Sequence, residues 1–124
     1  MPVKNTEPLF PGQVYHIYNH AIGDENLFRS RPNYLYFLKK YDEYIYPVAS
    51  TFAYNLMPNH FHLVNRVHNE TALLKHYCYL NGISNAEGLK VDYPRFVMQQ
   101  FSNFLNAYVK AFNKRHDRKG ALLI

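Results

Sequence analysis

The sequence contains no tryptophan, only one cysteine and no long apolar run. Cys78 cannot form a disulfide within the chain, so we expect a cytoplasmic protein in which this thiol packs as a small buried hydrophobic group. A membrane-spanning helix needs about 20 apolar residues in succession, so no membrane partner is expected. Residues 1–7 carry no apolar core of a secretory signal, which also favours the cytoplasm.

Three common catalytic motifs are absent as well. The chain has no glycine-rich phosphate loop, no Gly-x-Ser-x-Gly elbow and no Cys-x-x-Cys pair. Aromatic residues are abundant instead, with 12 Tyr and 9 Phe. Tyrosine is amphipathic, so we expect many of these rings to be half-buried around the core, and a tyrosine alone is no sign of a nucleophile. The 124 residues suit one domain, spanning 1–124.

The positive charge is confined to one end of the sequence. Residues 1–89 hold seven basic and seven acidic residues, whereas residues 90–124 hold seven basic and two acidic ones. Five of these cations form a cluster that we expect to bind DNA: Lys110, Lys114, Arg115, Arg118 and Lys119. The alternative is a solvated helix end, where cations are favoured by the helix dipole.

Hydrophobic periodicity and turn residues predict the element order β-α-β-β-α. The expected strands cover 13–19, 50–57 and 60–67, and the expected helices cover 31–46 and 95–116. Residues 71–80 could form a short further helix, and the apolar residues 121–124 could begin another strand. The order predicts an α+β, ferredoxin-like (RRM-like) fold that is incomplete at the C-terminus, with helices on one face of an antiparallel sheet.

The sharpest chemical feature is the tripeptide His60-Phe61-His62. Residues two apart in a strand point to the same face, so both imidazoles can converge on one divalent cation while Phe61 points into the core. The alternative is a pair of half-exposed histidines with no ligand. His16, on the first expected strand, could neighbour the third strand, although a hydrogen-bonded sheet histidine is the more ordinary role.

The run Leu-Met-Pro-Asn-His-Phe-His-Leu-Val over residues 56–64 resembles the signature of single-tyrosine HUH transposases, close to the REP-associated tyrosine transposases of bacteria. The similarity extends to residues 14–19, to 34–38 and to much of 101–122, so it covers nearly the whole chain.

The resemblance implies DNA transposition through cleavage of single-stranded DNA near a hairpin. It makes His60 and His62 ligands of a divalent metal, Mg or Mn, that polarises the scissile phosphate. In the family a tyrosine hydroxyl attacks this phosphate and forms a 5′-phosphotyrosine link, releasing a 3′-hydroxyl. The resemblance also implies that the basic helix end grips the DNA backbone and that the protein is a homodimer.

The family's nucleophile lies on a further helix, in a segment like Tyr-Ile-x-x-Asn-Pro, with the third metal ligand one turn later. Neither matches this sequence, so we expect the chain to lack its nucleophile and to be inactive alone. Tyr108 is a substitute candidate, but Phe112 stands where the ligand should be, and Tyr108 lies on an apolar helix stripe. Tyr77 and Asn81 have the four-residue spacing expected of the nucleophile and the third metal ligand, but they precede the long helix.

Two other interpretations of the sequence stay open. One is a non-catalytic RRM-like module that binds single-stranded nucleic acid by stacking bases on exposed aromatics, without metal. The other is a structural or self-associating protein whose missing strand is supplied by a partner chain.

Overall fold

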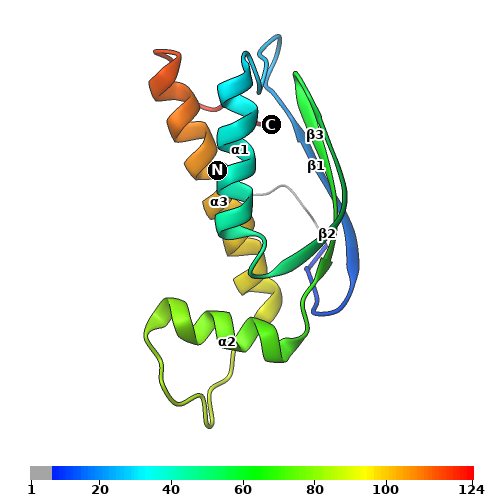
Figure 1. The fold of residues 1–124 in the computed structure, drawn as a ribbon, viewed down its shortest axis with the longest axis vertical. Helices are drawn as coiled ribbons and strands as arrows, with labels where there is room; N and C mark the ends of the chain where they lie inside the picture. The colour runs from blue at the N-terminus through cyan, green and yellow to red at the C-terminus, as the bar shows by residue number, and fades with distance from the viewer. Residues whose placement is uncertain (1–6) are drawn as a thin grey trace.

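The computed structural model describes residues 7–124, and its secondary structure follows the expected order. The elements are β1 (Val14–His20), α1 (Arg31–Tyr44), β2 (Ala49–Met57), β3 (His60–Val67), α2 (Glu70–Asn81) and α3 (Tyr93–Arg115). The three strands form an antiparallel sheet in the order β1-β3-β2. Helices α1 and α3 lie side by side on one face of this sheet (Figure 1). The α+β, ferredoxin-like arrangement is therefore confirmed.

The apolar residues near Ile124 lie along the outer edge of β1, as expected for the start of another strand. Ala21 and Leu123 form an antiparallel bridge. The amide of Ile22 donates to the carbonyl of Leu122 at 2.8 Å, and the amide of Ile124 donates to the carbonyl of His20 at 3.1 Å. This is the edge where a ferredoxin-like sheet carries its fourth strand.

Strand β3 is the centre of the sheet and is hydrogen-bonded on both sides. Its side chains alternate strictly between the core and the opposite face. The buried set is Phe61, Leu63, Asn65 and Val67, and the outward set is His60, His62, Val64 and Arg66. Among the described residues no helix covers this second face, which we call the open face (Figure 1).

The core between sheet and helices is built largely from aromatic rings. Phe37 of α1 packs against Phe104 of α3, with ring centroids 4.8 Å apart, and against Phe61 of β3 at 5.4 Å. Tyr108 is the one fully buried tyrosine among the described residues, whereas seven others are half-buried against the core. These seven are Tyr15, Tyr34, Tyr36, Tyr41, Tyr44, Tyr77 and Tyr93.

Three expectations need correction. Helix α3 begins at Tyr93 rather than at Arg95, because Pro94 sits in the first helical turn, where an amide has no partner within the helix anyway. Helix α2 is longer than expected and begins after Asn69, whose side chain accepts from the amide of Ala72 at 2.9 Å. Cys78 is only partly buried, not buried as expected.

No described helix is long and apolar enough to cross a membrane.

Candidate functional site

The two motif histidines project from β3 onto the open face, as their spacing predicts. His60 and His62 are half-buried, and their ring centroids lie 5.1 Å apart with the rings perpendicular. The Nδ1 atom of His60 lies 2.7 Å from the side-chain oxygen of Asn59. An amide oxygen can only accept, so Nδ1 carries the proton and the lone pair of His60 is on Nε2. Metal-binding histidines are held by the same kind of N–H···O contact.

A third histidine from the neighbouring strand contacts this pair. The Nε2 atom of His16, on β1, lies 2.8 Å from the Nδ1 atom of His62, and the two rings are stacked with centroids 5.0 Å apart. Within residues 7–124 no group of three or more histidine, cysteine or acidic side chains is arranged to hold a metal ion. The structure thus brings the imidazoles together in pairs.

A shallow cavity of about 260 Å³ opens beside the histidines at the end of the sheet. Its wall includes Asn19, His20 and Asn59 together with the motif residues. At its edge, the ring of Tyr18 is 63% exposed and stacks on His62 with centroids 5.8 Å apart. Tyr18 and His20 were missed as site residues, although the alternation of β1 already places both on the same face as His16.

The protonation of His62 depends on its surroundings. Burial lowers the pKa of His62 below its usual value of 6.5, and the nearby imidazoles of His16 and His60 lower it further. The ring is therefore neutral at pH 7. A neutral imidazole keeps the lone pair that a metal ligand needs.

The predicted basic cluster separates into two parts. Lys110, Lys114, Arg115 and Lys119 are exposed at the end of α3. Arg115 also lines a groove of about 420 Å³ between α1 and α3, which Lys39 borders from the other side. These four side chains are free to meet phosphate groups, as a DNA-binding surface requires.

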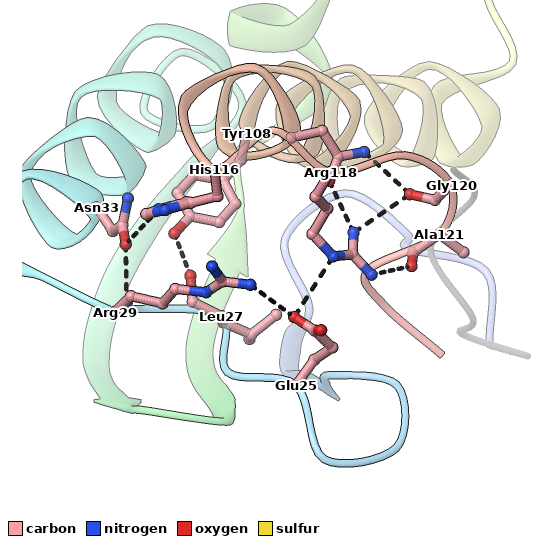
Figure 2. Close-up of polar contacts among 10 residues, drawn as sticks. Glu25, Leu27, Arg29, Asn33, Tyr108, His116, Arg118, Gly120 and Ala121 are labelled. Carbon is pink, nitrogen blue, oxygen red and sulfur yellow. Dashed lines mark hydrogen bonds and ion pairs between the residues drawn. The ribbon is translucent and has the colours of Figure 1, made fainter.

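Arg118, the fifth member of the cluster, is engaged within the protein. Its guanidinium donates to Asn113 Oδ1 at 2.7 Å and to the carbonyl of Ala121 at 2.8 Å, and lies 3.4 Å from a carboxylate oxygen of Glu25 (Figure 2). The same carboxylate oxygen accepts from Arg29 at 3.1 Å. Arg118 thus ties the segment after α3 to the loop before α1, and its role toward DNA stays a prediction.

The segment after α3 lies at the end of the sheet that carries His60. The amide of Ala21 donates to the carbonyl of Asn59 at 2.8 Å, next to His60. The side chain of Asn19 donates to the carbonyl of Ile124 at 3.1 Å, so the segment that follows α3 borders the histidine cavity.

Tyr108, the substitute nucleophile candidate, is only 2% exposed. Its hydroxyl donates to the carbonyl of Leu27 (Figure 2), and burial raises its pKa far above the usual value. A hydroxyl that is buried, bonded and hard to ionise is poorly placed to attack a phosphate. The contacts of Tyr108 favour a packing role. Tyr77, the other spacing candidate, packs edge-on against Phe96 at 5.2 Å.

Comparisons of the chain with protein-family models, with curated proteins and with solved structures found no match. The resemblance to HUH transposases therefore rests on the motif residues.

The packing role of Tyr108 gives a first test. In Tyr108→Phe the buried carbonyl of Leu27 has no donor, so we expect the free energy of unfolding to fall by about 1–3 kcal/mol in urea denaturation. Tyr79→Phe is the matched control, because Tyr79 is 80% exposed. An equal, negligible effect of both substitutions would contradict the assigned hydrogen bond.

His116 gives a second test, through pH. Burial lowers the pKa of His116 below 6.5, Arg29 and Arg115 lower it further, and Glu25 opposes them. Below pH 6.5 the unfolded chain binds more protons than the folded one, so the stability present above this pH is lost on acidification. We expect the Tm to fall as the pH drops below 6.5, and His116→Gln to reduce this fall. An unchanged pH dependence in His116→Gln would contradict the assignment.

Proposed function

We propose that this protein binds a divalent metal ion, Mg or Mn, and single-stranded or hairpin DNA on the open face of its sheet, as a member of the HUH class of DNA-transposition proteins. One observation carries the proposal: both motif histidines, His60 and His62, face solvent from the central strand, beside a cavity rimmed by amide and aromatic side chains.

The residues on this face fit a divalent ion. His60 presents its Nε2 lone pair because Asn59 accepts its Nδ1 proton, and His62 is neutral at pH 7. Two imidazoles leave further coordination positions for water and for phosphate oxygens. When bound, the ion would polarise a phosphate of the DNA.

The side chains around the histidines can hold a DNA strand. Asn59 brings an amide group to the cavity wall, and an amide can donate to a phosphate oxygen. The exposed ring of Tyr18 offers a surface on which a base can stack. The four exposed cations at the end of α3 lie at the same end of the molecule and would contact neighbouring phosphates. A homodimer, which the family resemblance implies, stays a prediction.

In the transposase reaction the attacking group is a tyrosine hydroxyl. Tyr108 is excluded from this role in our proposal by its hydrogen bond to Leu27 and its raised pKa. We therefore expect DNA binding and metal binding from these 124 residues, with no covalent DNA adduct that depends on Tyr108.

The one observation that favours the RRM-like alternative is the exposure of aromatic rings on the sheet. Tyr18 and Phe52 are each more than half exposed on the sheet. A module of that kind would bind single strands by stacking and would be indifferent to metal. Metal dependence therefore separates the two functions.

DNA binding can be measured by fluorescence anisotropy with a labelled hairpin that carries a single-stranded 5′ tail. We expect binding in Mn²⁺ to be more than about tenfold tighter than in EDTA, and His60→Ala with His62→Ala to abolish this gain. His68→Ala is the control, because His68 contacts the carbonyl of Tyr46 away from the cavity.

The same assay measures the role of the exposed cations. Lys114→Ala with Arg115→Ala should make the slope of log affinity against log salt concentration shallower, by about 0.7 for each phosphate that is no longer neutralised. An unchanged slope in this double variant would show that the DNA backbone does not reach the end of α3.

Equal affinities in Mn²⁺ and EDTA would instead support the RRM-like module. Absence of salt-dependent binding to any single strand would contradict both functions.

A further inference from the structure

The closest approach between two imidazole nitrogens on the open face joins different strands. His16 Nε2 and His62 Nδ1 are 2.8 Å apart, and their rings are inclined by only 28°. In the strand register His62 lies opposite Tyr18, so His16 is its diagonal neighbour on β1. The backbone pairing of β1 with β3 fixes this arrangement, since both strands are held by a continuous antiparallel ladder.

This nitrogen pair is close to the geometry of a metal chelate. Two nitrogens that each lie about 2.0–2.1 Å from one ion are separated by roughly 3.0–3.4 Å. The pair therefore needs to open by only a few tenths of an ångström to admit an ion. Neither nitrogen has a carboxylate or a carbonyl as a competing partner in the hydrogen bonds of the described residues.

The approach of the two rings is poorly explained as a structural hydrogen bond. His16 is exposed and His62 is half-buried, so water competes with the bond and its net contribution is small. Both rings lie on the face of the sheet opposite the buried core residues.

We propose that His16 is a metal ligand, and that His16 Nε2 and His62 Nδ1 form a chelate across the two strands. The inference rests on the proposed function in placing a divalent ion on the open face. In the hydrogen-bonded pair one of these two nitrogens carries a proton. Metal binding moves this proton, through solvent, to the other nitrogen of the same ring, so that His16 is protonated on Nδ1 and His62 on Nε2.

The proposal has a consequence for metal choice. A site of imidazoles alone binds Mg²⁺ weakly, because Mg²⁺ prefers oxygen ligands, and affinity rises from Mn²⁺ through Co²⁺ to Ni²⁺. With His16 as a ligand we expect the chain to bind Mn²⁺, Co²⁺ and Zn²⁺ clearly more tightly than Mg²⁺ in the absence of DNA.

The test is titration of the full chain with Co²⁺, followed by calorimetry and by the visible absorption of the bound ion. His16→Ala should weaken Co²⁺ binding by more than about tenfold and alter the absorption band, because the ion then has one nitrogen ligand fewer. His68→Ala is the matched control and should leave both unchanged. His16→Gln, which keeps a polar side chain on the exposed strand, should bind as weakly as His16→Ala if its circular dichroism matches the wild type.

Wild-type Co²⁺ affinity and an unchanged spectrum in a folded His16→Ala chain would overturn the proposal, even if metal-dependent DNA binding is observed. Weakened Co²⁺ binding in His16→Ala, together with a DNA affinity that is independent of metal in every variant, would support the chelate and contradict the proposed function. A wild-type chain that binds none of these ions would overturn both.

Discussion

The central position of β3 is the constraint on which the rest of the structure depends. β3 pairs with a strand on each side, and helices cover one face of the sheet (Figure 1), so its four buried residues face the helices and the alternating histidines face outward. A shift of one residue in either ladder would bury His60 and His62 and expose Phe61. The aromatic packing of Phe61 against α1 thus holds the histidines on the open face.

A polar network holds the segment after α3 beside the loop before α1. Glu25 lies between Arg29 and Arg118, and Asn33 accepts from the backbone amide of Arg29 at 2.8 Å while also facing His116 (Figure 2). This network fixes the loop before α1 against the segment after α3. The segment after α3 in turn borders the histidine cavity, because the side chain of Asn19 donates to the carbonyl of Ile124.

The element order, the shared face of His60 and His62 and the strand-like character of residues 121–124 could be predicted, because each follows from local sequence patterns. The position of residues 121–124 beside β1 could not. That the strand of His16 could neighbour the third strand was expected. The contact of His16 with His62 could not be predicted, because it depends on the register between strands whose histidines are 46 residues apart in the sequence. The internal bonds of Arg118 were missed for a similar reason: a charge cluster in the sequence does not indicate which member meets a carboxylate from a distant loop. The buried bond of Tyr108 depends equally on a distant partner, Leu27.

The central claim is that a divalent ion binds at the histidines of the open face. Two-dimensional NMR of ¹⁵N-labelled protein during addition of substoichiometric Mn²⁺ tests it directly, because the paramagnetic ion broadens only the amide signals near it. The account predicts that signals of residues 14–20 and 60–66 disappear first while those of α2 persist. Uniform broadening, or broadening centred on the acidic side chains of Glu70 and Asp92, would contradict it.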